Sequence, residues 1–215
     1  MFNNNKYLEI NDFLTKHSKS TKIVAISKNH PKESVIDAIK FGVKIFGENR
    51  VNEAKRKFED IKIANPLVKL HLTGPLQSNK VKDAAKLFDV FHTLDREKIA
   101  IEFNKHLLNL KNKEIFIQVN TGKEETKSGI FPADVSEFIN YCINDMQLNI
   151  IGLMCIPPVN EDPKIHFQLI SKLTNDLGLG APSIGMSSDY LDALNFNPRY
   201  IRLGTVLFGR RAWKK

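Results

Sequence analysis

The sequence predicts a single (β/α)8 TIM barrel, an α/β fold in which eight parallel strands alternate with helices. Short apolar runs recur every ~20 to 35 residues, and amphipathic helical patterns fill the intervals between them. No linker rich in proline, glycine or serine interrupts the 215 residues. This length lies at the short end of the range for a one-domain barrel, so we expect residues 1–215 to form one domain.

The apolar runs mark the expected strands. They are Ile23–Ser27, Lys44–Gly47, Leu70–Thr73, Val90–Thr93, Ile115–Asn120, Ile150–Met154, Ser183–Met186 and Tyr200–Leu203. An open parallel sheet of eight strands would leave two edges to protect, which favours closure into a barrel. The open doubly wound sheet is the alternative fold.

The expected helices begin at residues that suit a first turn or a cap. Their starting points lie near Pro31, Asn49, Ser78, Asp95, Pro132, Asp162 and Ser188. An extra helix, from about Asn5 to Lys16, precedes the first strand.

A formal net charge of +8 raises the question of nucleic-acid binding. Lysines are scattered through every helix and mixed with acidic residues, as in residues 55–60, and no basic run carries interleaved aromatic residues. This distribution is typical of a solvated surface, so we expect no specific nucleic-acid partner.

The two cysteines, Cys142 and Cys155, lie in apolar runs without the spacing of metal ligands. We expect buried reduced thiols, no disulfide and no metal site. The N-terminus has no apolar stretch of signal-peptide length, and no run of about 18 apolar residues occurs. These features predict a cytoplasmic protein without a membrane segment.

The residues after successive strands of a barrel share one rim, where active sites of this fold lie. Lys28 follows the apolar run at residues 23–26. A lysine at the end of a buried strand loses solvation for its ammonium form, which favours the neutral amine that imine formation requires. The alternative is a lysine whose stem lies on the rim while its amine reaches water.

Two further segments of this rim predict a phosphate site. Residues 185–189, Gly-Met-Ser-Ser-Asp, join a strand to a helix, and Gly204 and Thr205 end the last strand. Loops after strands seven and eight are the recurrent phosphate site of this fold, although Ser187 or Ser188 could simply cap a helix. Arg202 is expected to point into the barrel, toward a ligand acceptor such as a pyridine nitrogen. The alternative is a salt bridge to Glu48 or another rim carboxylate.

Six ordered motifs carry a resemblance to a known family. They are residues 24–28, 46–53, 71–80, 152–158, 185–189 and 202–205. With these motifs the sequence resembles the pyridoxal phosphate homeostasis proteins, which are similar to the barrel domain of alanine racemase. The chain departs from the common family pattern at Arg50 and Thr73, which leaves the roles of these two loops open.

The resemblance implies that the cofactor is pyridoxal 5′-phosphate (PLP), the vitamin B6 cofactor, held as a Schiff base on Lys28. It implies phosphate contacts at Ser187, Gly204 and Thr205, and a contact between Arg202 and the pyridine nitrogen. Met186 belongs to the same phosphate loop, and Asn49 matches an asparagine near the ring. The implied role is storage, delivery or protection of PLP by a monomer, with PLP-dependent apoenzymes as possible recipients and no catalytic residue.

Two other functions are weighed against this one. A PLP-dependent amino-acid racemase would use the same lysine as one acid/base, but none of the four tyrosines stands in a recognisable rim motif as the second. A basic nucleic-acid binder would leave Lys28, Ser187 and Arg202 without a shared purpose.

Overall fold

The computed structural model describes residues 2–18 and 20–209. Its eight parallel strands form a closed barrel in chain order, because β8 pairs with β1. The strands are β1 (Lys22–Ile26), β2 (Ile45–Glu48), β3 (Lys69–Leu72), β4 (Val90–Leu94), β5 (Glu114–Val119), β6 (Ile150–Cys155), β7 (Ser183–Met186) and β8 (Tyr200–Leu203). The predicted barrel is confirmed, no predicted strand end is wrong by more than one residue, and closure excludes the open sheet.

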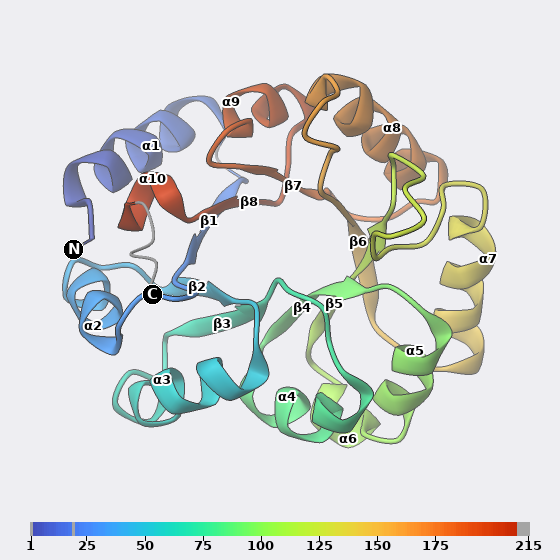
Figure 1. The fold of residues 1–215 in the computed structure, drawn as a ribbon, viewed down its shortest axis with the longest axis horizontal. Coiled ribbons are helices and arrows are strands. Elements are labelled where there is room, and N and C mark those ends of the chain that lie inside the picture. Colours follow the sequence, from blue (N-terminus) through green and yellow to red (C-terminus); the bar gives the residue numbers. More distant parts are fainter. Residues whose placement is uncertain (1, 19, 210–215) are drawn as a thin grey trace.

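Helices surround the barrel, as Figure 1 shows in a view through its centre. The α-helices are α1 (Asn4–His17), α2 (Lys32–Lys40), α3 (Val51–Ala64), α4 (Val81–Leu87), α5 (Glu97–Asn104), α6 (Leu107–Leu110), α7 (Val135–Asn140), α8 (Pro163–Asp176), α9 (Tyr190–Ala193) and α10 (Thr205–Phe208). Short 3-10 turns lie at η1 (Ser78–Lys80) and η3 (Leu194–Phe196), and a π turn at η2 (Tyr141–Asp145).

Local chemistry accounts for several helix starts. The extra N-terminal helix is confirmed as α1, and Asn3 caps it by accepting a hydrogen bond from the Lys6 amide at 3.0 Å. Asp162 does the same for α8, where its side chain accepts from the Lys164 amide. The largest differences, three residues each, are at α4 and α7, which begin at Val81 and Val135 rather than near Ser78 and Pro132, although the 3-10 turn η1 does begin at Ser78.

The main core lies between the barrel and its helices. Outward-facing strand residues such as Phe46, Leu70 and Ile115 are fully buried there. A smaller apolar cluster fills the barrel interior, with Val24 and Phe116 among its members. Buried polar side chains also occur inside the barrel, among them His71, His92 and Arg202.

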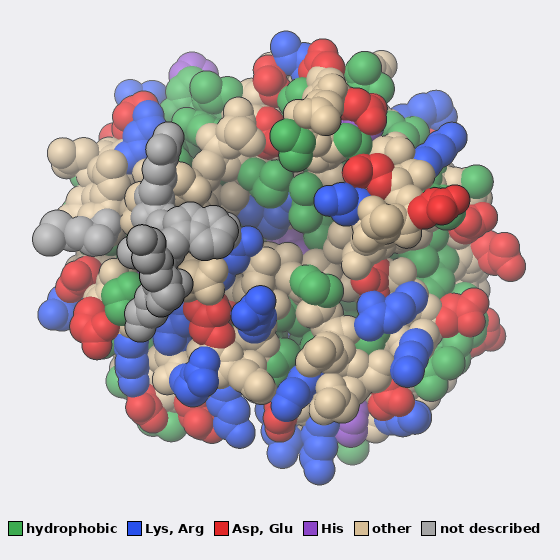
Figure 2. Space-filling model, in the orientation of Figure 1, with side chains coloured by type: hydrophobic (Ala, Val, Ile, Leu, Met, Phe, Trp, Pro, Cys, Tyr) green, Lys and Arg blue, Asp and Glu red, His purple; other side chains and the backbone are tan. Residues whose placement is uncertain are grey.

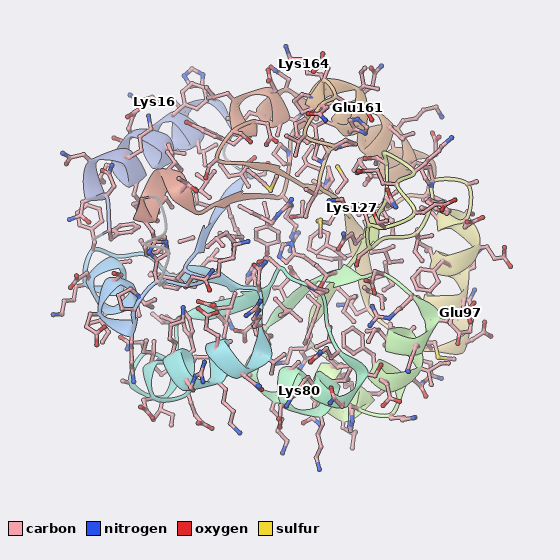
Figure 3. All side chains as sticks on the ribbon, in the orientation of Figure 1. Lys16, Lys80, Glu97, Lys127, Glu161 and Lys164 are labelled. Carbon is pink, nitrogen blue, oxygen red and sulfur yellow. The ribbon has the colours of Figure 1, made fainter. Side chains whose placement is uncertain are left out.

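Charges of both signs are spread over the face shown in Figure 2. Figure 3 labels Lys16 on α1, Lys80 in η1 and Lys164 on α8 around the outside of the barrel. Within the ranges that the structure describes, no helix combines the length and apolar character needed to cross a membrane.

Candidate functional site

A cavity of about 500 Å³ opens at the end of the barrel where the strands finish. This volume is within the range of small-molecule and cofactor sites. Figure 2 shows this face hollowed at its centre, with basic and hydrophobic side chains in the depression. All seven predicted site residues line the cavity: Lys28, Asn49, Met186, Ser187, Arg202, Gly204 and Thr205.

Lys28 lies in a tight turn directly after β1. The His30 amide donates to the Ser27 carbonyl at 3.1 Å, which closes a four-residue turn with Lys28 and Asn29 at its centre. Asn29 has a φ of 61°, in the left-handed region that asparagine tolerates better than most residues. The turn directs the chain from β1 toward α2 and places Lys28 at the cavity.

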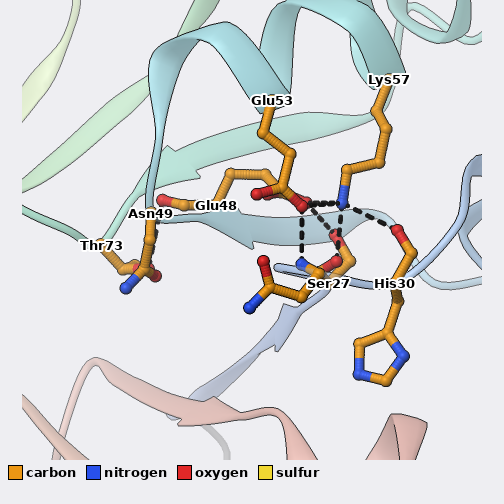
Figure 4. Close-up of polar contacts among 8 residues, drawn as sticks. Ser27, His30, Glu48, Asn49, Glu53, Lys57 and Thr73 are labelled. Atoms are coloured by element: carbon orange, nitrogen blue, oxygen red, sulfur yellow. Dashed lines mark hydrogen bonds and ion pairs between the residues drawn. The ribbon is translucent and has the colours of Figure 1, made fainter. Parts of the chain in front are cut away.

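Three charged residues hold this turn: Glu48 at the end of β2, and Glu53 and Lys57 on α3. We call them the turn clamp (Figure 4). Lys57 Nζ lies 2.7 Å from Glu48 Oε1 and 2.9 Å from Glu53 Oε1. It also donates to the carbonyl oxygens of Ser27, at 2.7 Å, and His30, at 3.1 Å. The clamp therefore contacts both ends of the turn that carries Lys28.

The two clamp carboxylates have different electrostatic surroundings. Burial raises the pKa of Glu48, although the charge of Lys57 and hydrogen bonds from Lys57 and Ser27 oppose this shift. Burial acts in the same direction on Glu53, but hydrogen bonds from Lys57 and the Asn29 amide outweigh it and lower that pKa. The directions differ because Glu48 is fully buried whereas Glu53 keeps some solvent contact. Glu53 therefore loses its negative charge at a lower pH than Glu48 does.

Arg202 contributes to the cavity from β8, the strand that pairs with β1. Only 5% of it is exposed. Its guanidinium donates to the Ser183 carbonyl and hydroxyl at 2.7 and 2.8 Å, and to the Cys155 carbonyl at 2.9 Å. Among the described residues it makes no ion pair, so the alternative of a salt bridge to Glu48 is wrong. Glu48 instead faces Lys57.

A chain of hydrogen bonds runs from Arg202 into the barrel, and we call Ser183, His92 and His71 the inner chain. Ser183 Oγ lies 2.9 Å from His92 Nδ1, and His92 Nε2 lies 2.9 Å from His71 Nδ1. Arg202 can only donate, so Ser183 Oγ accepts from it, and we assign His92 Nδ1 as the acceptor of the Ser183 hydroxyl proton. His92 then carries its proton on Nε2 and donates to His71.

Burial keeps both inner histidines neutral. It lowers the pKa of His71 to about 3 and that of His92 well below its ordinary value. Neutral rings suit the directed chain, because a second proton on His71 would leave two N–H donors facing each other between His71 and His92. The inner chain thus fixes Arg202 through hydrogen bonds rather than through an opposite charge.

The predicted phosphate loop is held together by Ser187. Its hydroxyl accepts from the Gly204 amide at 3.2 Å and the Val206 amide at 3.4 Å, which ties the β7 loop to the start of α10. No side-chain cap is found at α9, so neither Ser187 nor Ser188 caps the helix that follows their loop, and Ser187 contacts the start of α10 instead. Amides and hydroxyls from two neighbouring loops therefore converge at this edge of the cavity.

Several cavity residues were missed by sequence reasoning. Thr73 donates to Asn49 Oδ1 at 3.1 Å, which fixes the orientation of that side-chain amide. His30 stacks on Phe208, with ring centroids 5.2 Å apart. The other residues not predicted are Ile26, Ile156 and Gly209, whereas Ser188 belongs to the predicted phosphate loop. The position of Thr73 after the third strand was the available signal, since every strand end contributes to this rim.

Both cysteines are free and buried, as the sequence predicts. Within residues 2–18 and 20–209, no group of three or more His, Cys, Asp or Glu side chains could hold a metal ion. The cavity thus offers an amine, a guanidinium, an amide and hydroxyl groups. Such a set suits an anionic ligand that carries a carbonyl group and a hydrogen-bond acceptor.

Comparison with known proteins supports this chemistry. Residues 9–212 match the family described as alanine racemase, N-terminal domain. A pyridoxal phosphate homeostasis protein of Aquifex aeolicus (strain VF5) is 34% identical over 202 residues, covering 89% of this chain and 88% of that protein. The chain belongs to the family of pyridoxal phosphate homeostasis proteins. A relative of the same name from Schizosaccharomyces pombe is 35% identical over 212 residues, 93% of this chain and 88% of that protein.

Solved structures of similar proteins share the fold. PipY of Synechococcus elongatus PCC7942, whose structure has PLP bound, is 30% identical with a TM-score of 0.82, and the match covers 95% of this chain and all of PipY (100%). Alanine racemase from Acinetobacter baumannii has a TM-score of 0.72 at 13% identity, covering 95% of this chain and 61% of that one. The racemase likeness extends to the barrel fold alone.

Proposed function

We propose that this chain binds PLP covalently through Lys28 and serves in PLP homeostasis, by storing, delivering or protecting the cofactor without appreciable catalytic turnover. One observation carries the proposal. An amine, a buried guanidinium and a serine-centred phosphate loop, from β1, β8 and the loop after β7, meet in one cavity of suitable size. This chain also belongs to a family with a PLP-bound structural relative, PipY.

The cavity residues fit the parts of the cofactor. PLP supplies an aldehyde carbon that bonds to a primary amine, and Lys28 provides that amine. Arg202 makes three hydrogen bonds within the described protein, and its five N–H groups leave others to face the ring nitrogen. Ser187, Gly204 and Thr205 would hold the phosphate, with Met186 in the same loop, and Asn49 would lie near the ring.

The same residues argue against racemisation as the main activity. A racemase needs a proton-transfer group on each face of the substrate carbon. Among the described cavity residues neither a tyrosine nor a carboxylate accompanies Lys28, although His30 lies there. An arginine at the pyridine nitrogen also keeps that nitrogen unprotonated, which weakens the ring as an electron sink. Lys28 is therefore proposed as an attachment point rather than a catalytic residue.

Binding and turnover can be tested in one preparation. Protein freed of PLP is titrated with PLP, and its absorbance spectrum is compared with that of Lys28→Ala. The PLP-loaded protein is then incubated with single-enantiomer amino acids in D2O. We expect a new absorbance band only when Lys28 is present, and neither deuterium exchange at the α-carbon nor inversion. Multiple turnovers of inversion that vanish in Lys28→Ala would replace the proposal with a racemase.

We further propose that the protein works in the cytoplasm as a monomer and passes PLP to apoenzymes. Its match to relatives named as homeostasis proteins supports this role. Sedimentation velocity with and without PLP tests the monomer. Faster activation of a PLP-dependent apoenzyme by the holo protein than by the PLP it releases would support direct delivery, and equal rates would contradict it.

A further inference from the structure

We propose that Lys57 is a positioning residue for Lys28, and that covalent capture of PLP depends on the turn clamp. This inference rests on the proposed function. It is carried by the contacts of a buried lysine that lies beside the cavity rather than in it. Lys57 belongs to the middle of α3, and 9% of its side chain is exposed.

The bonds of Lys57 are directed at the Lys28 turn. An ammonium group has three N–H donors, and four acceptors lie within 3.1 Å of Lys57 Nζ. Two of these acceptors are the carbonyl oxygens of Ser27 and His30, the first and last residues of the turn. One cation thus spans the turn and sets the separation of its two ends.

The clamp also fixes the middle of the turn. Glu53 Oε1 accepts a hydrogen bond from the Asn29 amide at 2.6 Å. This amide belongs to the peptide that links Lys28 to Asn29, so the bond determines which way that peptide plane faces. Because the positive φ of Asn29 depends on this orientation, the bond also sets where the Lys28 side chain leaves the backbone.

Glu48 completes the arrangement from β2. It is fully buried, and its Oε1 accepts hydrogen bonds from Lys57 and from the Ser27 hydroxyl at 2.7 Å. The clamp is therefore anchored to the barrel wall by Glu48 and to helix α3 by Glu53 and Lys57 (Figure 4). A buried charged network of this kind holds one geometry strongly, since each member left alone would be a costly buried charge.

The chain provides a matched control for Lys57. Lys62, also on α3, donates to Asp89 Oδ2 at 2.7 Å and to the Leu87 carbonyl at 2.8 Å. Lys62 therefore binds a carboxylate and a backbone carbonyl, as Lys57 does. Its two partners precede β4, at the end of the barrel away from the cavity. A variant of Lys62 shows how the loss of such contacts affects ligand binding when the Lys28 turn is unchanged.

The experiment compares Lys57→Met with Lys62→Met, using PLP and pyridoxine 5′-phosphate as ligands. Pyridoxine 5′-phosphate carries an alcohol in place of the aldehyde, so it can occupy the phosphate and ring contacts but cannot bond to Lys28. Lys57→Met should weaken PLP binding by roughly tenfold or more, the size of one charge-assisted hydrogen bond. It should leave pyridoxine 5′-phosphate binding unchanged, and Lys62→Met should change neither affinity.

A double-mutant cycle separates positioning from general damage. In a Lys28→Ala background, Lys57→Met should no longer affect PLP binding, because the bond that it positions is absent. An equal loss of affinity with and without Lys28 would overturn the proposal, as would equal losses for the two ligands.

A milder pair of variants covers the case in which Lys57→Met does not fold. Glu53→Met removes the acceptor of the Asn29 amide, whereas Glu53→Gln keeps a carbonyl oxygen there. We expect weaker PLP binding in Glu53→Met and recovery in Glu53→Gln. No difference between the two variants would contradict the clamp. The proposed function fails if the wild-type protein binds PLP without a covalent bond to Lys28. If the clamp variants bind PLP covalently as well as the wild type does, only the positioning role is refuted.

Discussion

Two buried polar clusters flank the cavity, and they hold their charged side chains by different means. The turn clamp, between the barrel wall and α3, is ionic: two carboxylates surround Lys57. The inner chain, inside the barrel, has no carboxylate: Arg202 is fixed by Ser183 and by neutral histidines. The clamp acts on the backbone of a turn, whereas the inner chain acts on one side chain.

The difference reflects what each cluster has to position. A tight turn offers carbonyl oxygens and an amide, which a cation and an anion can bind together, so an ionic cluster suits it. A carboxylate bound directly to Arg202 would compete with a ligand acceptor for the same N–H groups. Hydroxyl, carbonyl and imidazole partners hold the guanidinium while leaving its charge available to the cavity.

The largest effect expected of a single substitution on stability separates the two clusters. Glu48→Ala removes one partner of a buried ion pair and should lower the free energy of unfolding by about 3 kcal/mol. Ser183→Ala in the inner chain should cost about 1–2 kcal/mol, because Arg202 keeps the Ser183 carbonyl. Urea denaturation measures both. Glu48→Gln retains an acceptor for Lys57 and is the control, and a greater loss in Ser183→Ala than in Glu48→Ala would reverse the comparison.

The pH dependence of stability should come mainly from the inner chain. The pKa of His71 is about 3 in the folded protein and about 6.5 when unfolded, so the unfolded chain binds the extra proton between these values. Stability should therefore fall as the pH is lowered from about 6.5 toward 3, by about 1.4 kcal/mol per pH unit for this group. His71→Met should show a shallower slope in urea titrations at several pH values, and an unchanged slope would exclude His71 as the source.

A double variant tests the predicted phosphate site, a part of the cavity outside both clusters. Changing both Ser187 and Thr205 to Ala should weaken PLP binding, each charge-assisted bond to phosphate contributing roughly 1.5–3 kcal/mol. Binding of pyridoxal, which lacks the phosphate, should be nearly unchanged because the clamp and the inner chain are intact. The same loss of affinity for both ligands would remove these residues from the phosphate site.

The smallest effect concerns the orientation of Asn49. Thr73→Val removes the hydroxyl that donates to Asn49 Oδ1 and should weaken PLP binding by only a few-fold, about the value of one neutral hydrogen bond. Isothermal titration with PLP measures this change. A loss as large as that expected for Lys57→Met would show that the ring contact matters as much as the clamp.

Much of this arrangement could be predicted from the sequence. The bounds of strands such as Ser183–Met186 and Tyr200–Leu203 agree with the predicted apolar runs. Both faces of a barrel strand are buried, so apolar residues occur on both. Lys28 and Arg202 were singled out by their positions, after the first apolar run and on the last strand, and the family resemblance gave them their roles. The short helix α10 was not predicted, since Thr205–Phe208 is too brief to show helical periodicity.

Neither polar cluster could be predicted in the same way. Glu53 and Lys57 stand four residues apart on α3, a spacing typical of exposed ion pairs, and only burial beside Glu48 distinguishes them. His71 and His92 lie on adjacent strands, but their bond depends on the stagger of β3 against β4. Such clusters depend on three-dimensional register, which periodicity does not report.

Attachment of PLP to Lys28 is the central claim, and reduction with borohydride tests it most directly. Holo protein is reduced, its intact mass is measured, and a digest is mapped, with Lys28→Ala treated in parallel. We expect one phosphopyridoxyl adduct per chain, located in the peptide that contains Lys28, and none at that position in the variant. An adduct found only on another lysine, or the same adduct mass in Lys28→Ala, would contradict the claim.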